Sequence, residues 1–236
     1  MTDARAHLAE LLGNRHTLLL DFDGPICSVF AGLPAPTVAA DLREKLFLEF
    51  GPSVKIPEGS DPLKLLREFA VDVHPTRVRF AENVLRQMEL VAVGTARATP
   101  GAAQLVLGAL GAGRQVAVVS NNSDASVEKY LDQENLRSNF TFVSARYSAM
   151  DPALLKPDPH LLHRALDWLN TAPSDAVIVG DSIADIEAGR VAGVMTIGFS
   201  TRQAKRDDLL EAGADAVCDD LFRIVDALAP KPEDRT

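Results

Sequence analysis

The sequence is poor in cysteine and has no long apolar run, and both absences narrow the class of protein. Its two cysteines, Cys27 and Cys218, are too few and too far apart for a disulfide framework or a zinc cluster, which predicts a cytoplasmic protein in a reducing compartment. No stretch approaches the ~18 uninterrupted apolar residues of a membrane span. The first residues lack the cationic start and the apolar stretch of a signal peptide. We therefore expect no membrane partner.

Clustered positive charge is also missing. The chain carries 24 Lys and Arg against 33 Asp and Glu, a formal net charge of −9, and no basic run stands out. This argues against nucleic acid as the main partner, because a phosphate backbone is bound by clustered cations. A small phosphorylated metabolite is compatible with an acidic protein, provided that a metal ion and local dipoles offset the repulsion.

The most informative feature that is present is an acid pair after a short apolar run. Residues 17–20 (Thr-Leu-Leu-Leu) show no polar alternation, which is typical of a strand buried on both faces of a parallel sheet. Asp21 and Asp23 follow at the strand end, where open α/β sheets bind ligands, and Phe22 is expected to turn away. Neighbouring carboxylates repel each other unless a cation or a shared proton relieves them. The alternative is a solvated turn in which Gly24 takes a positive φ.

Apolar segments alternate with helical patterns along most of the chain. Strands are predicted at 115–119, 141–143, 176–179 and 194–197, with a weaker one at 216–217. Helices are predicted at 3–13, 102–110, 127–131, 161–169 and 221–228. This alternation favours right-handed βαβ crossovers, and hence an α/β fold with a Rossmann-like parallel sheet core and helices on both faces. The length of 236 residues suffices for such a core with a smaller insert.

The stretch from residue 28 to residue 98 has a different pattern. Helical spacing recurs in it, with turn signals between the segments, at 42–50, 63–70 and 78–92. No convincing strand is visible in it. We therefore predict an inserted all-helical cap domain at 28–98, and an α/β core domain made of residues 1–27 and 99–228. The polar, proline-rich residues 229–236 are expected to form a frayed tail.

Two loops near other strand ends carry polar side chains. Ser120 and Asn121 follow a predicted strand and precede a predicted helix, where a hydroxyl and free backbone N–H groups can bind phosphate. The alternative is an ordinary helix N-cap. Lys156 precedes a proline, where a fixed ammonium can neutralise a phosphoryl oxygen or a nucleophile. The alternative is a solvated loop before a proline-led helix.

A second acid pair follows the strand at 176–179. Asp181 comes after Gly180, which allows close approach, and Asp185 follows four residues later near the start of a helix. Carboxylate oxygens suit Mg²⁺, which keeps several waters and needs only one or two carboxylates. The alternative is that both acids stabilise a helix N-terminus. A functional role for Asp181 and Asp185 is favoured over capping alone, because four acids would meet at one edge of the sheet.

Taken together, these motifs resemble the haloacid dehalogenase superfamily. The resemblance is to hydrolases of the phosphatase type with a helical cap, similar to phosphoglycolate phosphatases. It rests on four motifs in order, residues 21–24 (Asp-Phe-Asp-Gly), 119–121 (Val-Ser-Asn), 156–158 (Lys-Pro-Asp) and 180–185 (Gly-Asp-Ser-Ile-Ala-Asp). The match spans roughly residues 17–220, with residues 28–98 in the place of the cap.

The resemblance implies a phosphomonoester hydrolase that uses Mg²⁺. Asp21 would attack phosphorus and form an aspartyl-phosphate. Asp23 would protonate the leaving oxygen and then deprotonate the attacking water. Mg²⁺ would be held by the carboxylate of Asp21, the carbonyl of Asp23 and Asp181. An acid at Asp23 favours phosphate esters over carbon–halogen bonds, since halide leaves without protonation.

The resemblance also implies supporting roles. Ser120 and Asn121 would bind the phosphoryl group, Lys156 would neutralise it, and Asp185 would orient Lys156 or a metal-bound water. The chain departs from the family where a Thr usually follows Asp-Gly, because residues 25–28 read Pro-Ile-Cys-Ser. This departure bears on cap movement and substrate preference more than on the core chemistry.

Other functions are compatible with parts of this pattern. A phosphosugar mutase of the same superfamily shares the motifs. A non-catalytic phosphate-binding or signalling module also uses acids, a hydroxyl and a lysine, but a signalling receiver has its lysine after all the acids. The basic residues of the cap are interpreted as solvated helix charges rather than site residues: Lys64, Arg67, His74, Arg77 and Arg79. Monomer and homodimer are both compatible with the sequence.

Overall fold

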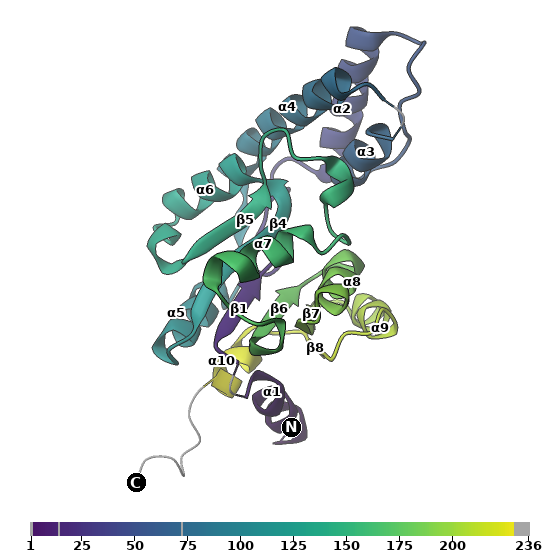
Figure 1. Ribbon diagram of the computed structural model, residues 1–236. Helices are drawn as coiled ribbons and strands as arrows, with labels where there is room; N and C mark the ends of the chain where they lie inside the picture. The colour runs from purple at the N-terminus through teal and green to yellow at the C-terminus, as the bar shows by residue number, and fades with distance from the viewer. Residues whose placement is uncertain (1, 14, 72, 229–236) are drawn as a thin grey trace.

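The computed structural model describes residues 2–13, 15–71 and 73–228, so the tail predicted at 229–236 lies outside the described residues. Its centre is a parallel sheet of six strands in the order β5-β4-β1-β6-β7-β8 (Figure 1). The strands are β1 (Thr17–Leu20), β4 (Gln115–Ser123), β5 (Phe142–Arg146), β6 (Ala176–Gly180), β7 (Met195–Phe199) and β8 (Ala216–Cys218). Because β1 pairs with β4 on one side and β6 on the other, its end lies at the middle of the sheet edge. The predicted α/β class with a Rossmann-like parallel sheet is confirmed.

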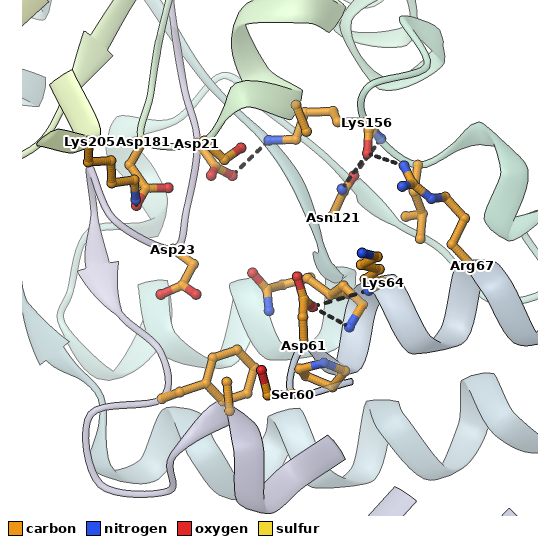
Figure 2. A pocket seen from close by; sticks show the side chains of 18 of the residues that line it. Asp21, Asp23, Ser60, Asp61, Lys64, Arg67, Asn121, Lys156, Asp181 and Lys205 are labelled. Carbon is orange, nitrogen blue, oxygen red and sulfur yellow. Dashed lines mark hydrogen bonds and ion pairs between the residues drawn. The ribbon is translucent and has the colours of Figure 1, made fainter. Parts of the chain in front are cut away.

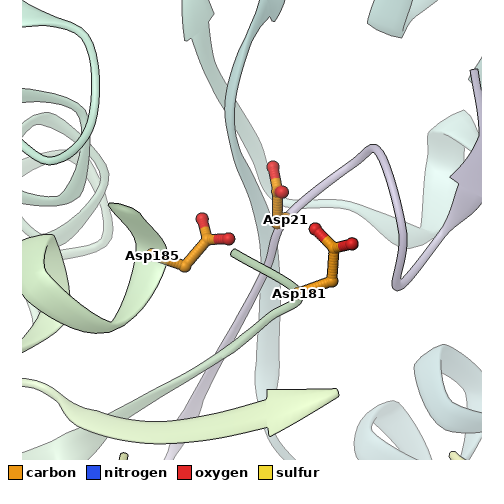
Figure 3. Close-up of side chains that lie close together, drawn as sticks. All are labelled: Asp21, Asp181 and Asp185. Atoms are coloured by element: carbon orange, nitrogen blue, oxygen red, sulfur yellow. The ribbon is translucent and has the colours of Figure 1, made fainter. Parts of the chain in front are cut away.

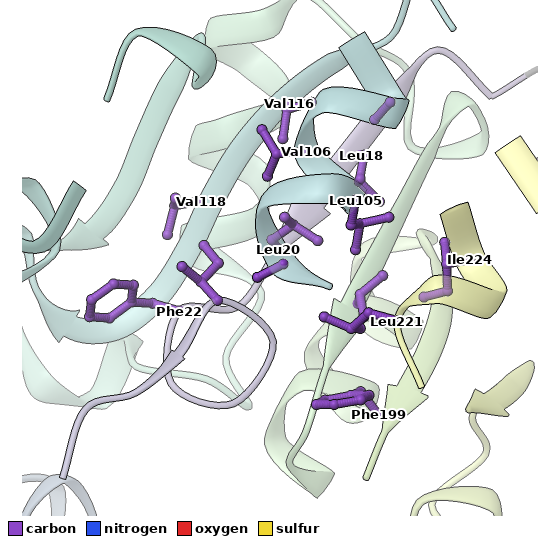
Figure 4. Packing of buried hydrophobic residues seen from close by; sticks show 14 of the residues in the cluster. Leu18, Leu20, Phe22, Leu105, Val106, Val116, Val118, Phe199, Leu221 and Ile224 are labelled. Carbon is purple, nitrogen blue, oxygen red and sulfur yellow. The ribbon is translucent and has the colours of Figure 1, made fainter. Parts of the chain in front are cut away.

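Helices cover both faces of the sheet. One face packs against α1 (Thr2–Leu12), α5 (Ala102–Gly111), α6 (Asp124–Gln133) and α10 (Phe222–Leu228). The other face packs against α7 (His160–Leu169) and α8 (Ile183–Ala192), while α9 (Gln203–Glu211) lies beside β7 and β8. Side chains of β1 alternate between the faces: Leu18 and Leu20 meet α5 and α10 (Figure 4), whereas Leu19 belongs to the opposite cluster.

Three helices lie beyond the sheet as a separate packing unit. These are α2 (Ala35–Phe50), α3 (Pro62–Phe69) and α4 (Pro75–Ala92), which extend away from the six strands in Figure 1. They surround an apolar cluster of their own that includes Leu42, Leu46, Leu66 and Leu85. The i, i+4 spacing of Leu42 and Leu46 gives α2 its buried face. Of the helices in the described residues, none has both the length and the apolar composition that a bilayer crossing requires.

The junction between the three helices and the sheet contains strands that the sequence did not predict. Residues Cys27–Ser28 (β2) pair antiparallel with Arg97–Ala98 (β3), so the prediction of no strand between 28 and 98 is wrong at both ends of this stretch. The amide of Thr99 also donates to the carbonyl of Ile26 at 3.0 Å. Strands of two residues are too short to show an alternating pattern, so the sequence gives no signal for them. They are defined by their pairing with each other across about 70 residues of chain.

Strand β4 is longer than predicted. It continues past Val119 to Ser123, with an irregular register between Ser120 and Ser123, and α6 begins only at Asp124. Ser123, not Ser120, is therefore the helix N-cap, and its hydroxyl accepts from the amide of Ser126. The polar residues after Val119 were interpreted as a strand end, but Ser120 pairs with Ala145 and Ser123 with Arg146, which extends the strand.

Candidate active site

Asp21 lies directly after β1 and is almost fully buried. Its amide donates to the carbonyl of Val179 at 2.9 Å, which fixes its backbone to β6. Its Oδ1 accepts from the amide of Phe22 at 2.8 Å and from Nζ of Lys156 at 2.9 Å. Within the described residues no hydrogen bond uses Oδ2, which leaves that oxygen for a ligand. Phe22 turns into the apolar core, as the alternation of the sequence predicted.

Lys156 is a buried ammonium between two carboxylates. Nζ donates to Asp21 at 2.9 Å, to Oδ1 of Asp185 at 2.5 Å and to the carbonyl of Val119 at 2.9 Å. Burial by itself lowers the pKa of Lys156, but the charges of Asp185 and Asp21 outweigh it and raise the pKa above its ordinary value. All three donor positions of the ammonium are used, so Lys156 is a fixed positive charge at this sheet edge.

Asp185 both caps α8 and holds Lys156. Its Oδ2 accepts from the amide and the hydroxyl of Ser182 in a capping box, while Oδ1 faces Lys156. The capping alternative is therefore confirmed for Asp185, the predicted contact with Lys156 is present as well, and its functional role stays a prediction. Gly180 makes the arrangement fit, because a Cβ there would lie 2.3 Å from Cβ of Asp185.

Three carboxylates converge at the sheet edge (Figure 3). Oxygens of Asp21, Asp181 and Asp185 lie within 4.8 Å of one another. Burial is the largest cause that raises the pKa of Asp21, and the charge of Asp185 adds to it. Burial likewise raises the pKa of Asp181, against the lowering effect of Lys205. Converging carboxylate oxygens are the donors that a hard divalent cation takes, so the three residues fit a Mg²⁺ site.

The second acid of the first motif, Asp23, lies apart from this cluster and borders the cavity. Its Oδ1 accepts from the amide of Val29 at 2.9 Å. Burial raises the pKa of Asp23 to about 6, despite the opposing hydrogen bond from Val29. A carboxyl with a pKa near 6 is suited to donate and accept a proton near neutral pH. Its carboxylate is not part of the three-acid group. The metal contact that the family resemblance implies for Asp23 is made by its carbonyl, not by its side chain.

Of the two residues predicted to bind phosphate, Asn121 borders the cavity and Ser120 does not. Asn121 lines the cavity, and its side chain clamps the backbone of Lys156: Nδ2 donates to the carbonyl at 3.1 Å and Oδ1 accepts from the amide at 2.8 Å. Ser120 is fully buried, and its hydroxyl accepts from the amide of Asn122 at 3.1 Å. Asn122, which the sequence did not nominate, borders the cavity instead.

A cavity of about 640 Å³ separates these residues from the three-helix unit. Figure 2 shows Asp21, Asp23 and Asp181 on one side, and Ser60, Asp61 and Lys64 facing them across the opening. Arg67 reaches the rim, where Nη1 donates to the carbonyl of Lys156 at 3.4 Å. Lys64 and Arg67 both border this cavity, although no role in the site was predicted for them from the sequence. Lys64 is also solvated, as the sequence indicated, because 63% of its side chain is exposed and its Nζ lies 3.8 Å from Glu68. His74, Arg77 and Arg79 border other hollows.

Sequence reasoning missed the basic residues of α9 and the turn before it. Lys205 forms an ion pair with Asp181 and lines the cavity together with Arg202. No local signal identifies them, because Lys205 is one of several charges on a mostly polar helix whose buried residue is Leu209. It reaches the site only because α9 packs beside β7, two strands from β1.

Comparison with known proteins places this fold in a family. Residues 60–199 match the haloacid dehalogenase-like hydrolase family. The chain belongs to this family. The resemblance seen in the motifs is thereby confirmed, and the match includes part of the three-helix unit as well as most of the sheet.

Relatives of this haloacid dehalogenase-like hydrolase include two phosphoglycolate phosphatases. That of Psychrobacter arcticus is 33% identical over 117 residues, which are 50% of each chain. That of Aquifex aeolicus is 38% identical over 84 residues, 36% of this chain and 38% of the relative. The matches thus span half or less of these curated relatives. CbbY from Rhodobacter sphaeroides in complex with phosphate shares the fold, with a TM-score of 0.65, 22% identity, and coverage of 87% of this chain and 94% of that chain.

Proposed function

We propose that this protein is a Mg²⁺-dependent phosphomonoester hydrolase that acts on a small phosphorylated metabolite through an aspartyl-phosphate. The observation that carries the proposal is the environment of Asp21. One carboxylate oxygen is held by Lys156 and a backbone amide, while Oδ2 is left for attack. The named activity of the phosphoglycolate phosphatase relatives supports the same chemistry.

In the first half-reaction, Oδ2 of Asp21 forms a bond to phosphorus as the ester P–O bond breaks. The leaving oxygen takes the electron pair of that bond and a proton from Asp23, whose pKa of about 6 suits the transfer. Lys156 stays fixed beside the reacting carboxylate and offsets negative charge.

In the second half-reaction, water attacks phosphorus and gives its proton to Asp23. The bond between phosphorus and Asp21 breaks, which restores the carboxylate and releases inorganic phosphate. Bound by Asp21 and Asp181, with Asp185 beside them, Mg²⁺ would supply positive charge to the transferring phosphoryl group.

The three-helix unit is proposed to act as the cap that sets substrate preference. The cavity of about 640 Å³ limits the substrate to a small molecule. Lys64 and Arg67 would meet the part of the substrate that is not transferred, and their charges favour an anionic group there. A cytoplasmic location is supported by Cys27 and Cys218, which are free thiols buried in the protein.

The test is turnover of para-nitrophenyl phosphate by the wild type and by Asp21→Asn, with and without EDTA. The proposal expects release of nitrophenol only from the wild type with Mg²⁺ present. Control variant Lys45→Met, on the exposed face of α2, should keep the wild-type rate. Equal rates for the wild type and Asp21→Asn would rule out the mechanism, and turnover resistant to EDTA would rule out the metal.

A further inference from the structure

A buried charged cluster joins helix α4 to the sheet outside the proposed catalytic residues. Arg146, the last residue of β5, is fully buried and forms ion pairs with two glutamates of α4. Nη1 donates to Glu82 at 3.1 Å, and Nη2 donates to Glu89 at 2.5 Å. Both glutamates are also buried. Such charges are costly to bury, and pairing each with a fixed partner offsets the cost.

The same arginine contacts the segment that follows the predicted phosphate-binding serine. Its Nε donates to the carbonyl of Asn121 at 3.1 Å. Glu89 contacts this segment as well, because its Oε2 accepts from the amide of Ser123 at 3.0 Å and its Oε1 accepts from the side chain of Asn122 at 3.4 Å. The irregular end of β4 is therefore held on one side by a cap helix, not by a neighbouring strand alone.

From Asn121 the contacts continue to the proposed catalytic lysine. The side chain of Asn121 holds both the amide and the carbonyl of Lys156, and Lys156 in turn holds Asp21. Helix α3 reaches the same backbone, since Arg67 donates to the carbonyl of Lys156 at 3.4 Å. A continuous set of hydrogen bonds thus runs from α4 to the end of β1.

We propose that Arg146 is a positioning residue that couples helix α4 to Lys156 through Asn121. With Glu89, it keeps α4 docked on the segment 121–123 and sets where the ammonium of Lys156 lies relative to Asp21. The catalytic consequence rests on the proposed function. The docking itself does not, so the two are tested separately.

The kinetic test uses Arg146→Lys, which keeps a positive charge but cannot span three acceptors in the planar arrangement of a guanidinium, and Glu89→Gln. Turnover of para-nitrophenyl phosphate is measured at a temperature at which circular dichroism shows every variant folded. In each variant kcat should fall about tenfold while KM stays nearly unchanged. This is the usual result when a residue that orients a catalytic group is altered. The double variant should lose no more than the worse single one, because the two residues act as a unit.

The control is Glu128→Gln, which removes an ion pair between the middle of α6 and Arg137, a residue that follows this helix. It should keep the wild-type kcat. A purely structural role for Arg146 would lower the melting temperature of Arg146→Lys and Glu89→Gln while leaving kcat at the wild-type value, and this result would overturn the proposal.

Two further measurements keep the proposal testable. If the single variants do not fold, the variant with Glu82→Gln, Glu89→Gln and Arg146→Met removes all three charges together, which is better tolerated than an unpaired charge. A wild-type kcat in that variant overturns the proposal.

If the wild type hydrolyses no phosphate ester, amide hydrogen exchange still reports whether α4 is docked on the segment 121–123. Peptides covering 121–123 and 155–157 should exchange faster in Arg146→Lys than in the wild type or Glu128→Gln, and equal exchange overturns it.

Discussion

Replacing Lys156 with methionine removes the positive charge on which the site's buried acids depend. In the wild type, Nζ bonds to Asp21 at 2.9 Å, to Asp185 at 2.5 Å and to the carbonyl of Val119 at 2.9 Å. Methionine fills a similar volume, so the packing survives while two buried carboxylates and a carbonyl each lose the ammonium as a partner. We expect the variant to fold, to be inactive, and to be clearly less stable than the wild type.

The size of the loss follows from burial. Breaking a buried ion pair by removing one partner costs about 3–5 kcal/mol of the free energy of unfolding. The loss should depend on pH. Burial and Asp185 already raise the pKa of Asp21, and removal of Lys156 raises it further. An acid whose pKa is higher in the folded than in the unfolded state destabilises the fold as pH rises, so the loss should be smaller near ~pH 5 than near ~pH 7.

Urea unfolding followed by far-ultraviolet circular dichroism measures this difference at both pH values without added metal. Lys45→Met is the matched control, because Lys45 is exposed on α2 and its loss should change stability by less than ~0.5 kcal/mol. A loss in Lys156→Met no greater than in the control, or a loss that grows as pH falls, would refute the reasoning.

Three other substitutions test separate parts of the site. Gly180→Ala places a Cβ 2.3 Å from Cβ of Asp185 and should cost about 1–3 kcal/mol of the free energy of unfolding, together with most of the activity. The control Gly111→Ala, in open space at the end of α5, should not destabilise the fold. Equal melting temperatures for the two variants would contradict this. Lys205→Met frees Asp181 from its ion pair and should tighten Mn²⁺ binding, measured by calorimetry or electron paramagnetic resonance; unchanged or weaker binding would show that the ammonium does not compete with the metal. Lys64→Ala should raise KM for phosphoglycolate, which has a second anionic group, more than KM for para-nitrophenyl phosphate; an equal rise for both would remove Lys64 from substrate recognition.

The sheet and the convergence of the acids could be predicted because they depend on local patterns and a general topological rule. A short unbroken apolar run marks a strand buried on both faces, as at Thr17–Leu20 and Ala176–Gly180. Carboxyl ends of parallel strands share one edge, so Asp21 and Asp181 were expected to meet, and their oxygens lie within 4.8 Å of each other.

The features that the sequence did not predict depend on contacts between distant segments. The pairing of β2 with β3 involves two residues on each side, which leave no periodic signal. Glu82 and Glu89 are seven residues apart on α4, a spacing that equally describes a solvated helix face. Only the position of α4 beside the end of β5 shows that both glutamates face Arg146. Lys205 is similar, since its role depends on how α9 packs.

The most direct test of the central claim is to find where the phosphoryl group is held during turnover. The wild type is mixed with Mg²⁺ and para-nitrophenyl phosphate, quenched in acid within the first turnover, and digested for peptide mass spectrometry, with Asp21→Asn treated in parallel. The account predicts a phosphoryl group on Asp21 in the wild type and none in the variant. Rapid turnover with the phosphoryl group on another residue, or the same labelling in Asp21→Asn, would contradict it.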